Sequence, residues 1–242
     1  GDFTPIKDGV VVCNAEGKIT AVGKQGEIAL PADAKVLEAA VVTPGIIDCR
    51  STVGLSGILN LPRHDQEQSD HGAPVQPELR AFDAYNGRDP LVSWLRNLGV
   101  TTVHTGHAPG ALIAGQTMVL KTDVEDIVND SDTLRPLAMV ATTLGSTKGG
   151  SSPGTRAKAI AMLRAELLKA QEHLKKVEEA EDDKKPEPNL KLDTLAAALR
   201  GEVPLLIEAH RHHDITAALR LQKEFNFKLV LSGASEGYLL LD

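Results

Sequence analysis

Aromatic residues are scarce in this chain and make up only 3% of its 242 residues. A buried core must therefore be built mainly from Val, Leu, Ile and Ala. The overall contents of 42% hydrophobic and 24% charged residues are ordinary for a folded domain. A chain of this length can bury one large core, or a large core and a small one. The composition thus excludes a disordered protein and favours an aliphatic α/β core.

Clusters of Lys and Arg are also missing, and the formal net charge is −7. A nucleic-acid surface needs a basic patch to neutralise phosphates, so nucleic acid is not expected as a partner. No apolar run reaches the roughly 18 residues that would span a bilayer, and GDFTPIKDG at the N-terminus does not resemble a signal peptide. A membrane partner is not expected either. Because residue 1 is not Met, a removed leader and a fragment of a longer protein both stay open.

The chain has only two cysteines, Cys13 and Cys49, at unrelated positions. Two such cysteines do not make a disulfide framework. We expect both to be reduced packing residues, which favours a cytoplasmic location.

Strand patterns dominate the first part of the chain. GVVVCNAEGKITAVG, residues 9–23, predicts a β-hairpin because two apolar runs flank residues that favour a turn. A third short strand is expected at 35–38. TPGIID, residues 43–48, is expected to be a buried strand in the centre of a parallel sheet. Residues 1–43 are therefore predicted to form a small β-sandwich portion, separate from a second domain at 44–242.

From Pro44 onward, apolar strand patterns alternate with helical ones, which is typical of a parallel sheet built from βαβ units. The expected strands are 43–48, 100–105, 137–144, 203–210 and 227–233, and the expected helices are 89–98, 155–181, 192–200 and 214–225. About five barrel-type strands result, whereas a closed (β/α) barrel has eight. The expected fold class is therefore α/β, a partial (β/α) TIM-type barrel. A second polypeptide or a missing C-terminal part would complete it, and the apolar GYLLLD at 237–242 favours a homo-oligomer.

The order of several segments carries a family resemblance. The hairpin runs GVVV and GKITAVG lead into TPGIID, and GVTTVHTG (99–106) and IEAHRHHDITAALRLQKEF (207–225) follow. Together they resemble the amidohydrolase superfamily, in particular its imidazolonepropionase-like branch. The resemblance implies a (β/α) barrel and hydrolysis of non-peptide C–N bonds, such as those of cyclic amides. It also implies zinc or another divalent metal at the strand ends, which would activate water and polarise a carbonyl.

The metal motif implied by this resemblance is degenerate. The His-x-His of the family falls on Arg50 and Thr52, the next ligand falls on His210, and the following one falls on Gly233 in LSGAS. The last ligand, an Asp, is expected beyond residue 242. Arginine stays protonated and would bring positive charge to the cation site. An altered or absent metal centre is therefore expected.

Other histidines could supply replacement ligands. His104 and His107 in VHTGHAPG are expected where a strand turns into its loop, on the active-site face of a barrel. They could join His210 and His212 in a relocated metal site. The alternative is that they are solvated or hydrogen-bonded to the backbone.

The segment RHDQEQSDH, residues 63–71, could contribute His64 as a proton carrier and Asp65 or Glu67 as a general base. A polar, solvated loop is the alternative, although the length of this connection is typical of a lid or binding segment. We expect the guanidinium of Arg50 to pair with a carboxylate of 65–70 or of a substrate, because a buried unpaired Arg is costly. The expected substrate-binding residues are Arg50, His64, Asp65, His104 and His107.

The Gly- and Ser-rich GSTKGGSSPGT, residues 145–155, could bind an anion through its backbone N–H groups, but it lacks the end of a P-loop, and a flexible loop is the alternative. Two functions remain. One is a hydrolase of small-molecule C–N bonds, favoured by the histidines. The other is a catalytically inactive relative that binds a small molecule or serves in assembly, favoured by Arg50 and Thr52.

Overall fold

The computed structural model describes residues 4–145, 153–181 and 186–241. The chain forms two compact units, Gly1–Pro44 and Gly45–Asp242. Most of the expected anion-binding loop, residues 146–152, lies outside the described residues.

The first unit contains an antiparallel hairpin. Strand β1 (Gly9–Cys13) pairs with β2 (Ile19–Lys24), and the backbone N–H of Gly17 donates to Asn14 O across the turn (3.0 Å). Gly17 has a φ of +74°, which a residue without Cβ adopts at no steric cost. The predicted hairpin is confirmed. The third strand expected at 35–38 is wrong, because these residues are exposed and form no strand.

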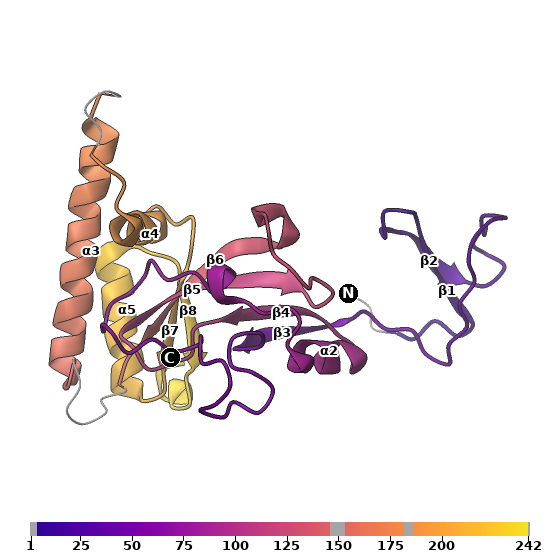
Figure 1. Ribbon diagram of the computed structural model, residues 1–242, viewed down its shortest axis with the longest axis horizontal. Coiled ribbons are helices and arrows are strands. Elements are labelled where there is room, and N and C mark those ends of the chain that lie inside the picture. Colours follow the sequence, from indigo (N-terminus) through magenta and orange to yellow (C-terminus); the bar gives the residue numbers. More distant parts are fainter. Residues whose placement is uncertain (1–3, 146–152, 182–185, 242) are drawn as a thin grey trace. The chain divides into compact units, whose positions relative to one another are not determined.

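The second unit is built on a six-stranded sheet with the order β3-β4-β5-β6-β7-β8. Its strands are β3 (Ile46–Ser51), β4 (Val100–Gly106), β5 (Ile113–Lys121), β6 (Arg135–Thr143), β7 (Leu205–Ala209) and β8 (Leu229–Gly233). β3 is parallel to β4, and β6, β7 and β8 are parallel to one another, whereas β5 is antiparallel to both of its neighbours. The sheet is a curled, mixed half-barrel, consistent with a partial barrel (Figure 1).

Two expectations about the sheet are corrected. Strand β5 was not expected, and it makes the sheet mixed rather than parallel. Strand β3 was expected in the centre but is an edge strand that pairs only with β4 among the described residues. Its Ile46 and Ile47 are accordingly exposed, at 58% and 60%.

The four expected helices of the second unit are present, and a short helix, α1, was not expected. They are α1 (Ala81–Ala84), α2 (Pro90–Asn97), α3 (Arg156–Glu179), α4 (Leu190–Leu199) and α5 (His212–Phe225), with 3-10 turns η1 (Asp130–Asp132) and η3 (Gly237–Leu240). Asp89 caps α2 and Pro90 is its first residue, as predicted. Thr155 caps α3 by accepting a hydrogen bond from the backbone N–H of Lys158.

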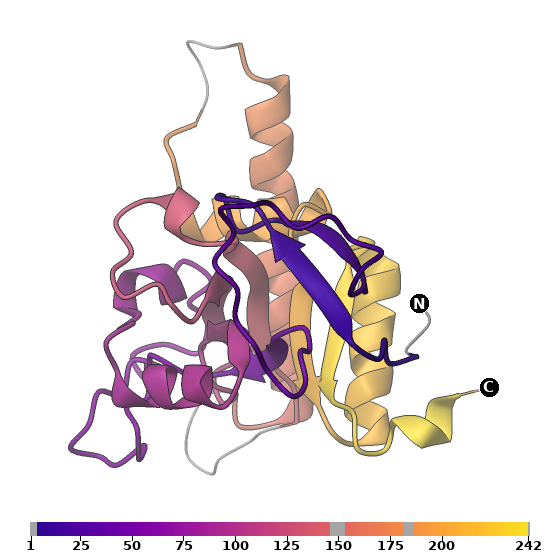
Figure 2. The same cartoon turned by 90° about the vertical axis from the view of Figure 1, so that its right-hand side faces the viewer.

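Helices α3, α4 and α5 pack together beside the sheet (Figures 1 and 2). Their shared core is aliphatic, as expected, and includes Leu163, Leu195, Leu205 and Leu221, all with 0% exposure. Full burial of each such side chain contributes about 2 kcal/mol of hydrophobic stabilisation. A second cluster, around Leu55, Ala81, Val103, Met118 and Leu120, lies under α1. The two clusters hold the sheet and so fix the ends of its strands.

Both cysteines are free, as expected, but both are exposed, so the expected packing role is wrong. None of the helices among the described residues is both long enough and apolar enough to cross a membrane.

Candidate functional site

The chemically interesting residues gather at one edge of the sheet. Because β3, β4, β6, β7 and β8 all run in the same direction, their carboxyl ends meet at the same edge. Ligands of open α/β sheets bind outside the carboxyl ends of the strands. This edge is therefore the candidate functional site.

A cavity of about 340 Å³ opens at the ends of β6 and β7. It is lined by Pro109, Thr143, Leu144, Gly145, Arg156, Glu208, His210, Arg211 and Asp214. We call it the strand-end cavity. Its lining combines aliphatic carbons with both acidic and basic groups, a combination that suits a small polar organic molecule.

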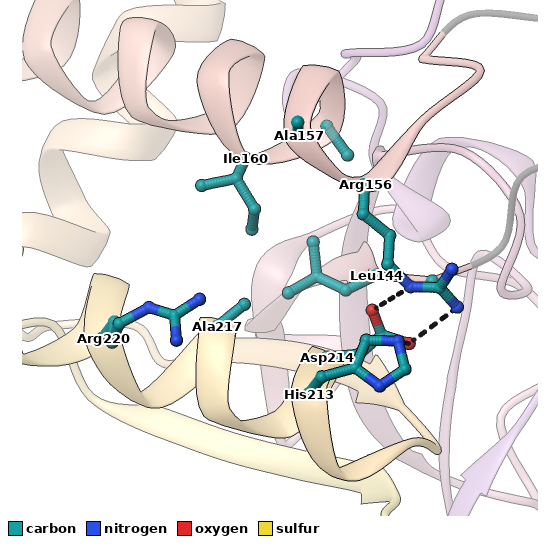
Figure 3. A pocket seen from close by; sticks show the side chains of 10 residues that line it. Leu144, Arg156, Ala157, Ile160, His213, Asp214, Ala217 and Arg220 are labelled. Atoms are coloured by element: carbon teal, nitrogen blue, oxygen red, sulfur yellow. Dashed lines mark hydrogen bonds and ion pairs between the residues drawn. The ribbon is translucent and has the colours of Figure 1, made fainter.

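An ion pair between α3 and α5 forms one wall of the strand-end cavity. Arg156 Nε lies 2.8 Å from Asp214 Oδ1, and Arg156 Nη2 lies 3.3 Å from Asp214 Oδ2. Asp214 is only 5% exposed, so this two-fold contact compensates for the burial of its charge. Figure 3 shows the pair beside a neighbouring cavity, also of about 340 Å³, where Ile160 and Arg220 face each other between the helices.

Arg50 lies at the end of β3 and reaches across to β4. Its guanidinium donates to Ser51 O at 3.2 Å and to the carbonyl oxygen of His107. It forms no ion pair within the described part of the chain, so the pairing expected with 65–70 is not present. Burial lowers the pKa of Arg50, while Glu208 and Asp48 act in the opposite direction and raise it. Among the acidic residues that line the cavity, Glu208 is therefore the one whose charge raises the pKa of Arg50.

His104 lies inside β4, two residues before the strand ends, and is 6% exposed. Its Nδ1 lies 2.8 Å from Cys49 O and its Nε2 lies 2.6 Å from Thr117 Oγ1. A carbonyl only accepts, so Nδ1 carries the proton and Nε2 accepts from the Thr117 hydroxyl. Burial lowers the pKa of His104 from its ordinary value of 6.5. Both ring nitrogens are thus used in tying β3, β4 and β5 together.

His107 follows β4 and is 4% exposed. Its Nδ1 lies 3.1 Å from Gln116 O of β5. Burial lowers the pKa of His107 as well, and the nearby guanidinium of Arg50 adds to this effect. His107 therefore holds Arg50 through its carbonyl oxygen and β5 through its ring.

His210 follows β7 and is the most accessible histidine of this edge, with a side chain that is 55% exposed. Its Nε2 lies 3.0 Å from Glu208 Oε1 and its Nδ1 lies 2.9 Å from Ser235 Oγ. His212, two residues later, bonds instead to Glu236, with Nδ1 3.0 Å from Glu236 Oε2. The two histidines therefore have separate acidic partners.

The loop between β3 and α1 carries the remaining expected residues. His64 is half-buried, and its Nδ1 is a buried atom without a hydrogen-bond partner among the described residues. Asp65 and Glu67 are exposed, and the backbone N–H of Glu67 donates to Leu55 O at 2.9 Å. The roles of His64 and Asp65 in substrate binding stay predictions.

The expected metal ligands can be tested for their fit to a divalent cation. Within residues 4–145, 153–181 and 186–241, no three His, Cys, Asp or Glu side chains lie together so that they could hold one. Arg50 brings a cation to the position of a ligand, and Gly233 has no side chain to offer. His104 and His107 engage their Nδ1 atoms with backbone carbonyls, whereas His210 and His212 bond to the carboxylates of Glu208 and Glu236. These residues do not fit a zinc ligand set, and the relocated site stays a prediction for metal analysis.

Three residues of the edge were not expected from the sequence: Glu208, Asp214 and Ser235. A sequence signal existed for Ser235, because GASEG at 233–237 has the spacing G-x-S-x-G and follows a strand. Asp214 had none, because its partner Arg156 lies on another helix. Glu208 was not singled out, although its partner His210 is only two residues away.

The comparison with solved structures finds an amidohydrolase from Thermotoga maritima MSB8, with a TM-score of 0.83 and 26% sequence identity. The match covers 95% of this chain and 61% of that protein. No protein-family model matches the sequence, and no curated protein matches it. The chain thus spans about three fifths of the length of the Thermotoga protein. This likeness supports an amidohydrolase-like fold and, with it, the amidohydrolase superfamily.

Proposed function

We propose that this chain belongs to a hydrolase of the amidohydrolase type that acts on a non-peptide C–N bond of a small, cyclic amide. The observation that carries the proposal is the strand-end cavity, which is lined by Glu208 and His210 at the carboxyl end of β7. The likeness to the Thermotoga amidohydrolase supports the same reading. The imidazolonepropionase-like branch is part of the proposal and rests on the sequence motifs.

Arg50 is proposed to bind an acidic group of the substrate. Two of its five N–H donors are used by carbonyl oxygens, which leaves donors for a carboxylate. The neighbouring Glu208 disfavours an anion that binds too close to β7. A substrate whose single carboxylate lies some distance from its amide bond would fit both residues. Its carboxylate could bind Arg50 without lying close to Glu208.

The second candidate is a catalytically inactive relative that binds a small molecule or serves in assembly. The replacement of two expected ligands by Arg50 and Thr52 favours it, as does the absence of a fitting ligand set among the described residues. The cavity would then serve for binding alone.

Metal analysis and ligand binding separate these alternatives. We expect less than one zinc per chain in protein purified without added metal, measured by inductively coupled plasma mass spectrometry. The double variant Arg50→His/Thr52→His restores one imidazole at the end of β3 and one directly after it, but Gly233 still cannot ligate, so we expect only weak metal uptake. Stoichiometric zinc bound at positions 50 and 52 of the unmodified protein would contradict the altered centre.

For the substrate, a panel of cyclic amides with and without a carboxylate is tested by calorimetry and by hydrolysis. Arg50→Ala should weaken binding of the carboxylate-bearing members roughly tenfold or more, as expected for a lost charged hydrogen bond. Arg63→Ala is the matched control, because Arg63 is an exposed arginine of the β3–α1 loop. Equal losses in both variants would argue against a role for Arg50. Binding without hydrolysis would favour the second candidate.

A further inference from the structure

The turn that follows β8 has an unusual backbone. Gly233 and Ala234 have φ values of +77° and +44°, and η3 begins three residues later at Gly237. A residue with a Cβ is strained in this region, so Ala234 is held there by its surroundings. Its backbone N–H donates to Ala209 O (2.9 Å) and that of Glu236 donates to His210 O (2.8 Å). Ser235 therefore sits on a sharp strand-to-helix turn that is fastened to the end of β7.

Ser235 is the first member of a hydrogen-bonded chain of three side chains. Ser235 Oγ lies 2.9 Å from His210 Nδ1, and His210 Nε2 lies 3.0 Å from Glu208 Oε1. An ionised carboxylate only accepts, so Nε2 carries the ring proton and Nδ1 offers its lone pair to the Ser235 hydroxyl. A serine hydrolase has a hydroxyl, an imidazole base and an orienting carboxylate in this order. The two ring nitrogens are exchanged here, because Nδ1 faces the hydroxyl and Nε2 faces the carboxylate.

The arrangement is open to a substrate. Glu208 and His210 line the strand-end cavity, and Ser235 is exposed beside them. Ser235 also has a backbone N–H that makes no hydrogen bond within the described residues. In chymotrypsin-type serine hydrolases the N–H of the nucleophile itself is one of the donors to the oxyanion. The donor of a G-x-S-x-G elbow, the N–H of the following residue, is bonded here to His210 O, because it belongs to Glu236.

Gly233 is required for this geometry. A Cβ built on Gly233 would lie 2.5 Å from His210 Cε1 and 2.9 Å from His210 Nδ1. A side chain here would therefore push the imidazole away from Ser235. The family resemblance assigns a metal-binding histidine to position 233. The ring of His210 fills the space that a side chain at this position would need.

We propose that Ser235, His210 and Glu208 form a nucleophile, base and orienting carboxylate that hydrolyse small carboxylic esters without a metal. The inference rests on the proposed function, since it uses the strand-end cavity as its substrate site. Ser235 Oγ bonds to the ester carbonyl carbon, and its proton passes to His210 Nδ1. The bond from that carbon to the alcohol oxygen then breaks, and the alcohol leaves with the proton. Water attacks the acyl-enzyme, His210 takes one proton and returns it to Ser235 Oγ, and the carboxylic acid is released.

The test uses the full chain, treated with a chelator, and two probes. A fluorophosphonate should form a covalent adduct that peptide mass spectrometry maps to Ser235. p-Nitrophenyl acetate should give a burst of about one p-nitrophenolate per chain before the steady rate, because an acyl-enzyme accumulates. Ser235→Ala should abolish the adduct and the burst and lower the steady rate roughly 100-fold or more. Ser232→Ala, a serine of β8 three residues earlier, is the matched control and should change neither.

Two further variants keep the nucleophile in place. His210→Gln and Gly233→Ala should each slow adduct formation roughly tenfold or more while Ser235 remains present. The inference is overturned if the unmodified chain, folded by circular dichroism, is not labelled at Ser235, or if Ser235→Ala hydrolyses the ester as fast as the unmodified chain. Binding or hydrolysis of cyclic amides that persists without labelling would leave the proposed function standing and remove only this inference.

Discussion

At the scale of single residues, burial sets the charge of the site. His104 and His107 are 6% and 4% exposed, and desolvation lowers the pKa of each below its ordinary value of 6.5. Arg50, itself half-buried, repels a second positive charge on either ring. The folded protein therefore keeps both rings neutral at a pH where the unfolded chain begins to protonate them.

The depressed pKa values predict a loss of stability in acid. The stabilisation is fully present above about pH 6.5, where both states are neutral, and it is lost as the pH falls toward the folded-state values, because the unfolded chain then binds more protons. The slope should reach at most about 1.4 kcal/mol per pH unit for each histidine. Urea unfolding of chelator-treated protein at a series of pH values measures it. His104→Gln should flatten the slope, and an unchanged slope in this variant would refute the role of His104.

Arg50 shows how much of the site could be predicted from single residues. Its position at a strand end followed from the TPGIID pattern, and the structure places it there. The hydrogen-bond partner of Arg50 could not be predicted from this pattern. The guanidinium binds the carbonyl oxygen of His107, whose position depends on the pairing of β3 with β4 and on where β4 ends. A sequence pattern fixes which residues end a strand but not which backbone atoms of the neighbouring strand face them.

At the scale of elements, helix ends are the features most securely encoded by local sequence. Asp89 accepts a hydrogen bond from the backbone N–H of Leu91 at 2.8 Å, and it is 5% exposed. Asp89→Ala should therefore lower the free energy of unfolding by about 1 to 2 kcal/mol, whereas Asp89→Ser should retain most of it. Urea unfolding is the measurement, with the exposed Asp123→Ala as control. Equal effects of the substitutions at 89 and 123 would show that the cap is not stabilising.

Strand β5 marks the limit of element prediction. Nearly all residues of its sequence, IAGQTMVLK, are buried. The strand therefore lacks the alternation of apolar and polar residues that marks a half-buried strand. A regular βαβ alternation also leaves no place for a strand directly after β4. The same limit applies to Ser235, because its chemistry depends on β7 and β8 lying side by side, with Ala209 paired to Gly233. Such contacts belong to the pairing of strands, not to any one strand.

At the scale of the whole molecule, the sheet of the second unit has two open edges among the described residues. β3 and β8 each pair with one neighbour, and an unpaired strand edge is a template for another chain. Exposed apolar side chains accompany both ends of the sheet. Ile46 and Ile47 on β3 are 58% and 60% exposed, and Tyr238 and Leu241 after β8 are 69% and 82% exposed. A closed barrel would pair both edges and cover such side chains.

We therefore expect the 242-residue chain to associate with itself through these edges. Light scattering should give a mass above that of a monomer, falling on dilution. Replacing Ile46 and Ile47 by Lys places charges on the edge of β3, which opposes strand addition and should shift the mass toward the monomer. Leu168→Lys is the matched control, because Leu168 is 52% exposed but belongs to helix α3 and not to an edge strand. A compact monomer at all concentrations, with a single cooperative unfolding transition, would show that the open edges are tolerated and that no second copy is needed to cover them.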